Sequence, residues 1–235
     1  MAKTVIAGDV ISYLEMCQEV GASGLQAGMN FRLRGRSIFL MSRRPNAPYI
    51  DQVNEEDGTL IYEGHDAKKS SEIKDPKSID QPEFNSNGKP TQNGLFAAMA
   101  RRYKEGETPA EIVSVFEKLH SGVWVYNGDF QLIDCWQEKS DKRMVFKFKL
   151  RFAERLHVSS ERLVEVSTED DRVIPSRVKL EVWKRDHGCC KICGSNQSLH
   201  FDHIIPYSKG GTSKDTKNIQ ILCSKHNLAK HDRIE

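Results

Sequence analysis

The C-terminal part of the chain gathers residue types that bind metal ions. Four of them form a CxxC pair and a CxxH pair about thirty residues apart, and they are Cys190, Cys193, Cys223 and His226. Three sulfur donors and one imidazole at this spacing are typical of a tetrahedral structural zinc site. Cys189 could compete for the ion, but the CxxC register favours Cys190 and Cys193.

A second group of side chains, between and beside these ligands, offers harder donors. Asp202 and His203 are adjacent, and Asn227 directly follows His226. Carboxylate, amide and imidazole groups suit a catalytic cation better than a structural zinc ion. A closed metal site next to an open one indicates a nuclease.

Residues 177–233 resemble the HNH endonuclease family, whose pattern is an Asp-His pair on a strand, an Asn in the next loop and a His or Asn on a helix. The resemblance implies that Asp202 and Asn227 bind one catalytic Mg²⁺ or Mn²⁺ ion. It also implies that His203 is the general base and that Asn218 holds the His203 loop in place. An imidazole with a pKa near ~6.5 can take a proton from water at neutral pH, and a hard cation stabilises charge on the phosphate.

The net charge of +2 is unevenly distributed along the 235 residues. Residues 1–153 carry 21 basic and 21 acidic side chains, residues 154–171 carry 2 and 6, and residues 172–235 carry 12 and 6, which together give the totals of 35 and 33. The positive excess therefore belongs to the metal-binding segment. It fits a phosphate backbone as partner, although a solvated surface explains it equally well.

An acidic stretch without aromatic residues divides the chain into two units. We predict a first domain over residues 1–153, a linker over residues 154–175 and a second domain over residues 176–235. Ser176 is the expected N-cap of the first helix in the second domain, because it precedes a run with helical periodicity.

The chain has no signal that directs it into or across a membrane. No apolar run approaches the ~20 residues that cross a bilayer, and Asp9 interrupts the N-terminal run before a signal peptide could form. Three of the six cysteines lie outside the zinc pattern, which does not suit a disulfide framework. We therefore expect a cytoplasmic protein.

The first domain alternates short apolar runs with turn signals. Six of these runs predict strands, at residues 31–34, 37–41, 60–62, 123–126, 130–133 and 145–150. Leu95–Tyr103 is the clearest helix. Residues 112–116 are ambiguous, because the capping box at Thr108 favours a helix and the β-branched side chains favour a strand. So many short strands predict a curved sheet or a barrel.

Residues 28–152 resemble the SRA domain, also called YDG, in the order and spacing of four short motifs. The motifs are Tyr62-Glu63-Gly64, the run Thr91–Ala97, the run Val125–Phe130 and the run Val145–Arg151. The third contains Tyr126-Asn127-Gly128, in which Asn127 replaces the Asp of the family signature. The resemblance implies an α+β protein with an SRA-like curved β-barrel, flanking helices and a C-terminal zinc-braced ββα-metal (HNH) domain. It also implies that residues 112–116 form a strand.

SRA domains hold a flipped modified cytosine between two aromatic rings while a carboxylate reads its edge. In this chain the resemblance implies Tyr49 and Tyr62 as the rings, with Asp51 and Glu63 in the same pocket. Asp51 is the candidate for reading the base edge, but the family's usual offset from Tyr49 falls on Gln52. The two tyrosines could equally be ordinary aromatics of the barrel, with Asp51 a turn residue.

Basic side chains in both domains are candidates for contacts with the DNA backbone. They are Arg32, Arg34, Arg43, Arg44 and Lys230. Arg32 and Arg34 share one face of an extended strand, so a solvated sheet face explains them almost as well.

Together these features predict a DNA endonuclease that depends on base modification. The N-terminal domain would read 5-methylcytosine or 5-hydroxymethylcytosine in double-stranded DNA, and the HNH domain would hydrolyse nearby phosphodiesters. One HNH site cuts one strand, so we expect a homodimer. The alternatives are an HNH nuclease or nickase that is insensitive to modification, and a zinc-braced reader of modified DNA that does not cleave.

Overall fold

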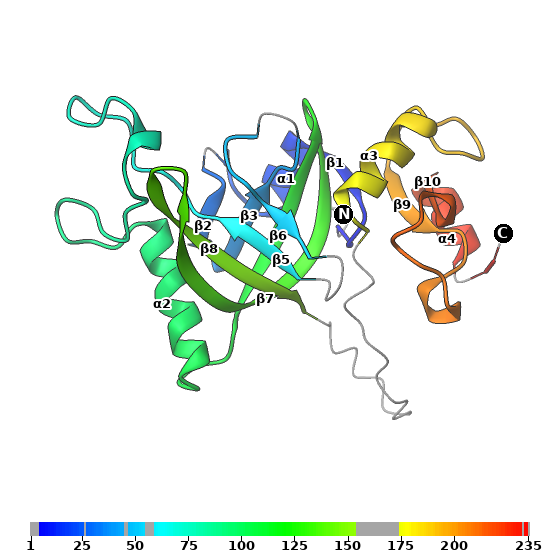
Figure 1. Cartoon of the computed structure of the whole chain (residues 1–235). Coiled ribbons are helices and arrows are strands. Elements are labelled where there is room, and N and C mark those ends of the chain that lie inside the picture. The colour runs from blue at the N-terminus through cyan, green and yellow to red at the C-terminus, as the bar shows by residue number, and fades with distance from the viewer. Residues whose placement is uncertain are drawn as a thin grey trace.

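A strongly curved β-sheet with a long helix packed against it forms the N-terminal part of the computed structural model, and a small unit of helices and two strands follows (Figure 1). The structure describes residues 5–25, 27–44, 47–54, 59–153, 174–231 and 233–234. Within them lie both helices and strands, so the predicted α+β class is confirmed. No helix in these ranges is both long and apolar enough to span a membrane.

The sheet of the N-terminal part has the strand order β2-β3-β6-β7-β8-β5-β4, and β1 pairs with β7 outside this path. Neighbours are antiparallel except for β3 and β6, which run parallel. The strands are β1 Val10–Ser12, β2 Met29–Leu33, β3 Arg36–Met41, β4 Gln52–Val53, β5 Leu60–Glu63, β6 Glu111–His120, β7 Val123–Ser140 and β8 Arg143–Phe152. In the described part of the chain β2 and β4 remain the two ends of the path, so closure into a barrel stays a prediction.

All six predicted strands are present, and two of them merge. Residues 123–126 and 130–133 belong to the single strand β7, which stays paired with β6 across the intervening turn signal. The merger is possible because Gly128, at φ +109°, sits at a β-bulge that keeps both halves in the sheet. Residues 112–116 lie inside β6, so the strand reading of the ambiguous segment is confirmed.

Two helices belong to the N-terminal part. The short helix α1 spans Tyr13–Glu19 and begins at a capping box formed by Ser12 and Glu15. The longer helix α2 spans Gln92–Lys104, with Thr91 as its N-cap. Phe96, Ala97 and Ala100 of α2 are fully buried and belong to the main hydrophobic core of the sheet.

The C-terminal part is a two-stranded antiparallel hairpin between two helices. Strand β9 (Leu199–His203) pairs with β10 (Ile219–Cys223), helix α3 spans Ser176–Arg185, and helix α4 spans Ser224–Lys230. The N-cap of α3 is Pro175, so the prediction of Ser176 was wrong by one residue. Pro175 has the fixed φ of a proline and starts the helix without a side-chain hydrogen bond.

The two parts share one hydrophobic cluster. Leu119 and Val125 of the sheet pack with Val178 and Val182 of α3 and with Phe201 of β9, and all five are nearly or fully buried. The predicted linker, residues 154–175, lies outside the described residues except for its last two. The described residues therefore join the two parts through packing.

Candidate functional site

The predicted zinc ligands converge on one point at the end of the β9–β10 hairpin. The ligand atoms of Cys190, Cys193, Cys223 and His226 all lie within 4.8 Å of one another. The Sγ atoms of Cys193 and Cys223 are 3.8 Å apart, and Nδ1 of His226 lies 3.3 Å from Sγ of Cys223. Two sulfurs on a tetrahedral zinc ion are separated by about 3.8 Å, so the donors present fit this ion.

Backbone N–H groups around the ligand cluster favour the thiolate form of Cys190. Burial acts to raise the pKa of the Cys190 thiol, but backbone N–H groups of Cys223, Cys193 and Ile192 outweigh it and lower the pKa to about 6. A thiolate is the form that binds zinc. Cys189 is outside the cluster, with its sulfur against the carbonyl oxygen of His187, as the CxxC register predicts.

The hairpin presents Asp202 and His203 at the last two positions of β9. Nε2 of His203 forms a hydrogen bond of 2.8 Å with the hydroxyl of Ser213, whose side chain is fully buried. Oδ2 of Asp202 accepts a hydrogen bond of 3.3 Å from Gln220 on the neighbouring strand. The imidazole and the carboxylate are therefore held by partners from two different segments.

Asn218 braces the loop that follows His203, as the resemblance implies. Its Oδ1 accepts from the backbone N–H of Ile205 at 2.8 Å, and its Nδ2 donates to the carbonyl oxygens of Ile205 and Thr212. Gly211 lies in the same loop, where a Cβ would overlap the Ile205 carbonyl, so only glycine fits. The loop is thus tied at both of its ends to one buried amide.

From the sequence we expected Lys230 on the surface, within reach of a phosphate. The structure shows that this prediction was wrong. The Lys230 side chain is 1 % exposed, its ammonium lies 3.0 Å from Oδ2 of Asp202, and it donates to the carbonyl oxygen of His203 at 2.7 Å. The cause is its position in the last turn of α4, which packs against β9. Lys230 is therefore part of the support of the Asp-His pair.

Asn227, the second predicted ligand of the catalytic cation, lies on α4. This helix packs against both strands of the hairpin, so Asn227 and Asp202 belong to neighbouring elements. One carboxylate and one amide oxygen, completed by water and phosphate oxygens, are a donor set that Mg²⁺ or Mn²⁺ accepts.

Ser213 is the residue that sequence reasoning missed, because nothing in its spacing connects it with His203.

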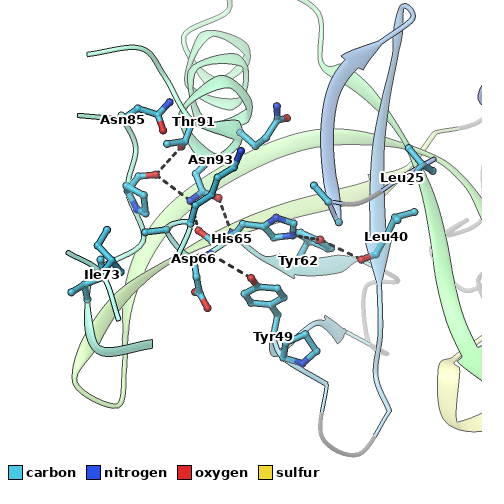
Figure 2. Close-up of a pocket in the computed structure, with 18 of the residues that line it drawn as sticks. Leu25, Leu40, Tyr49, Tyr62, His65, Asp66, Ile73, Asn85, Thr91 and Asn93 are labelled. Atoms are coloured by element: carbon cyan, nitrogen blue, oxygen red, sulfur yellow. Dashed lines mark hydrogen bonds between the residues drawn. The ribbon is translucent and has the colours of Figure 1, made fainter. Parts of the chain in front are cut away.

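A cavity of about 1120 Å³ opens on the N-terminal sheet, and both predicted tyrosines line it (Figure 2). Tyr62, on β5, is 3 % exposed and stacks on Phe39 with ring centroids 4.2 Å apart. Its hydroxyl lies 3.1 Å from Nε2 of His65. The ring of Tyr49 is parallel to the imidazole of His65, with centroids 5.0 Å apart. His65 is thus a third flat ring of this cavity, in contact with both tyrosines.

His65 and Asp66 are the titratable groups at the centre of the cavity wall. Burial lowers the pKa of His65 to about 4, so its imidazole is neutral at pH 7. Burial would raise the pKa of Asp66, but hydrogen bonds from Arg143, Gln81 and Lys77 outweigh it and lower this pKa. Beside the two tyrosines the cavity therefore offers the neutral imidazole of His65 and the carboxylate of Asp66, and Glu72 is a second carboxylate of its lining.

Asp51 and Glu63 are not among the residues that line this cavity, although the sequence placed them in the pocket. Both carboxylates are turned into the protein. Asp51 accepts from the backbone N–H groups of Ser42 and Glu63 at 3.0 and 3.1 Å. Glu63 pairs with the ammonium of Lys147 at 3.0 Å. The carboxylates that do line the cavity are Asp66, four residues after Tyr62, and Glu72.

The buried carboxyl of Asp51 should make stability depend on pH. Burial raises its pKa to about 7, against the two backbone hydrogen bonds, which act to lower it. Between its ordinary pKa and about 7 the folded protein keeps a proton that the unfolded chain releases. The free energy of unfolding should therefore fall as pH rises through this window, by up to about 1.4 kcal/mol per unit.

Urea unfolding of the wild type and of Asp51→Asn at about pH 5 and about pH 8 measures this contribution. The stability of the wild type relative to the variant should be lower at the higher pH. An equal difference at both pH values would show that Asp51 does not titrate in this range.

The four candidate arginines have different surroundings. Arg32 is bound to Glu111, with Nη2 2.7 Å from Oε2, so its charge is already paired. Arg34 is exposed at the β2–β3 turn, Arg44 donates to the Ser42 hydroxyl, and Nη1 of Arg43 is buried without a partner among the described residues. Contact with DNA stays a prediction for Arg34, Arg43 and Arg44, and Arg32 would first have to leave Glu111.

The C-terminal part is similar to a known protein family. Residues 190–233 match the family described as HNH endonuclease. This match confirms the predicted HNH domain and, with it, the prediction of an endonuclease. No curated protein matches the chain.

Several solved structures are similar in fold. The SRA domain of SUVH5 with hemimethylated CG DNA is 23 % identical, at a TM-score of 0.45 over 65 % of this chain and 92 % of that one. The same domain with fully hydroxymethylated CG DNA is 22 % identical, at 0.46 over the same shares. ScoMcrA, a type IV phosphorothioation-dependent restriction endonuclease, is 14 % identical, at 0.42 over 97 % of this chain and 55 % of that one.

Proposed function

We propose that this protein is a metal-dependent DNA endonuclease that cuts in response to a modified cytosine, which the cavity on the N-terminal sheet receives. The observation that carries the cleavage half is the Asp202-His203 pair at the end of β9, inside the segment that matches HNH endonucleases. Asn218, Ser213 and Lys230 support this pair from three sides. Such fixed geometry is what hydrolysis of a phosphodiester requires.

In this proposal His203 takes a proton from the attacking water. A neutral imidazole is an effective base near pH 7, and the bond to Ser213 fixes the plane of its ring. Asp202 and Asn227 would hold a Mg²⁺ or Mn²⁺ ion, which supplies charge stabilisation at the phosphate when bound. Lys230 keeps the Asp202 carboxylate oriented and adds a positive charge beside it.

The reading half rests on the three flat rings of the cavity. A flipped base needs aromatic faces to stack on, and such stacking contributes roughly 1 to 3 kcal/mol per base. Tyr49 already stacks with His65, so an entering base would take the place of this imidazole against the Tyr49 ring. Asp66, at the same wall, is the carboxylate that would accept from an exocyclic amino group.

Digestion of matched plasmids tests the proposed function directly. Plasmids with cytosine, 5-methylcytosine, 5-hydroxymethylcytosine or 6-methyladenine are incubated with the protein and Mg²⁺ or Mn²⁺, and the fragment ends are sequenced. Cutting of the cytosine-modified plasmids alone is expected. Equal cutting of all four would leave an HNH nuclease without a reading function, and no cutting with either ion would leave a DNA-binding protein.

Tyr49→Ala should remove the preference for modified DNA. Tyr49 is half-buried, whereas Tyr62 is part of the core, so a change at Tyr49 tests stacking without opening a cavity beside Phe39. Loss of one stacking partner should reduce the ratio of the cutting rates on modified and unmodified plasmid by about 5- to 100-fold. Tyr49→Phe keeps the ring and should keep the ratio. A normal ratio in Tyr49→Ala would mean that the base does not enter this cavity.

Two copies would be needed to cut both strands, because one site of this kind cuts one strand. The homodimer predicted from the sequence therefore remains part of the proposal. At low protein concentration, nicked plasmid should then appear before linear plasmid. This order would support the proposed homodimer.

A further inference from the structure

A buried ion pair connects the nuclease helix α3 with the reader sheet. The ammonium of Lys179, on α3, lies 2.9 Å from Oε2 of Glu117, on β6. The two side chains are 3 % and 2 % exposed. Removing two charges from water is costly, so such a pair is retained only where its geometry is good and further hydrogen bonds complete it.

Asn127 completes this pair and makes it a triangle. Its Oδ1 accepts from Lys179 at 2.6 Å, and its Nδ2 donates to Oε2 of Glu117 at 3.2 Å. Burial would raise the pKa of Glu117, but the charge of Lys179 and these hydrogen bonds outweigh it and lower the pKa. Glu117 is therefore ionised at neutral pH, and the triangle holds one positive and one negative charge.

The backbone of β7 directs Asn127 toward the nuclease. Val115 pairs with Gly128 and Phe116 with Tyr126, so Asn127 is the extra residue of a β-bulge. A bulge changes the direction in which a side chain points. Asn127 also occupies the place of the Asp in the Tyr-Asp-Gly signature. The amide accepts from Lys179 and donates to Glu117 at once, whereas an ionised carboxylate here would have no proton to donate and would repel Glu117.

A second line of contact lies on the N-terminal segment. The N–H of Gly8 donates to the carbonyl oxygen of Tyr126 at 2.8 Å, and the carbonyl oxygen of Gly8 accepts from the N–H of Phe201 at 3.1 Å. The next residue, Asp9, pairs with the imidazole of His200 at 2.9 Å, and both side chains are buried. Rotation of the nuclease relative to the reader would have to break this line as well as the triangle.

From these contacts we propose that Lys179, Glu117 and Asn127 are positioning residues, which hold the nuclease in one orientation on the reader and so fix the distance from the modified base to the cut. This inference rests on the proposed function. Its structural half, a joint that opens when the triangle is broken, can be measured without DNA.

The test compares the wild type with three variants, each with both domains present. In Asn127→Asp two carboxylates face each other, so the joint should open. In the double variant Asn127→Asp with Glu117→Gln the amide and the carboxylate exchange places around Lys179, so the joint should close again. Lys139→Ala, an exposed change at the far end of β7, is the control.

The first measurement sequences the cut ends of a duplex that contains a single 5-methylcytosine. The wild type should cut within a narrow window, and Asn127→Asp should lower the share of cuts at the commonest position at least about two-fold and slow cutting by up to about 100-fold. The double variant should restore the narrow window. The positioning proposal is overturned if the wild-type ends are scattered, or if a folded Asn127→Asp protein cuts as the wild type does.

The second measurement is hydrogen exchange of the free proteins. Peptides that contain Phe201 or helix α3 should exchange faster in Asn127→Asp and return to the wild-type rate in the double variant. If Asn127→Asp does not fold, the double variant tests the proposal instead. It should restore both folding and the narrow window of cut positions only if the triangle of Lys179, Glu117 and Asn127 holds the two parts together. A wild type that leaves modified DNA intact would contradict the proposed function, and the exchange rates would still test the joint.

Discussion

Cleavage by His203→Ala should be about 10²- to 10⁴-fold slower than cleavage by the wild type, with DNA binding retained. The imidazole is the general-base candidate of the Asp-His pair, because the Asp202 carboxylate is engaged by Lys230 and Gln220. The side chain is half-buried, and its removal deletes the hydrogen bond with the Ser213 hydroxyl without removing a core residue. The loss should therefore fall on the rate of the chemical step.

Single-turnover cleavage of modified DNA and a gel-shift titration separate the two effects. His120→Ala, an exposed histidine at the end of β6, is the matched control and should cut as the wild type does. If His203→Ala cleaves at the wild-type rate, the general base is another residue and the HNH assignment of this position is wrong.

Removal of the zinc ion should unfold the C-terminal unit and abolish cleavage. The binding of structural zinc contributes about 10 to 16 kcal/mol in zinc-finger peptides, which equals or exceeds the whole stability of a typical domain at about 5 to 15 kcal/mol. The ligand cluster closes the end of the β9–β10 hairpin, and the hairpin carries Asp202 and His203. Loss of the ion should therefore release both catalytic candidates.

Two adjacent cysteines provide a matched pair for this test. Cys190→Ser removes a ligand, whereas Cys189→Ser changes a sulfur that lies outside the cluster. Metal analysis should find about one zinc ion per chain in the wild type and in Cys189→Ser, and far less in Cys190→Ser. Thermal unfolding should show the lower midpoint in Cys190→Ser alone. A folded and active Cys190→Ser protein would show that the cluster does not hold a structural ion.

The zinc site could be read from the sequence because its information is local. The four ligands come in two close pairs, which are Cys190 with Cys193 and Cys223 with His226. Each pair lies within one turn of the chain, and these ligand types at this spacing are typical of a tetrahedral zinc site. The brace of Asn218 on the His203 loop was also accessible, through the resemblance to HNH endonucleases. The strands followed from alternation of apolar residues, and even the ambiguous segment 112–116 was decided by the order of motifs.

The rest depended on contacts between segments far apart in the chain. Lys230 was expected on the surface because a lysine near a helix end usually is, and only the packing of α4 on β9 buries it. Asp51 was chosen as a carboxylate close to Tyr49 in the sequence, although the family's usual offset falls on Gln52, and its carboxylate turns inward to two backbone N–H groups. Asp66 and His65 face the cavity because β5 ends just before them.

The cluster shared by the sheet and the C-terminal unit limits how freely the two can be recombined. Leu119 and Val125 of the sheet lie in one hydrophobic cluster with Val178, Val182 and Phe201 of the C-terminal unit. A chimera that grafts this nuclease onto an unrelated reader would leave an apolar patch of this cluster open to solvent and prone to aggregation. Engineering of a new target preference should therefore alter the cavity around Tyr49 and leave the hydrophobic cluster between the sheet and the C-terminal unit unchanged.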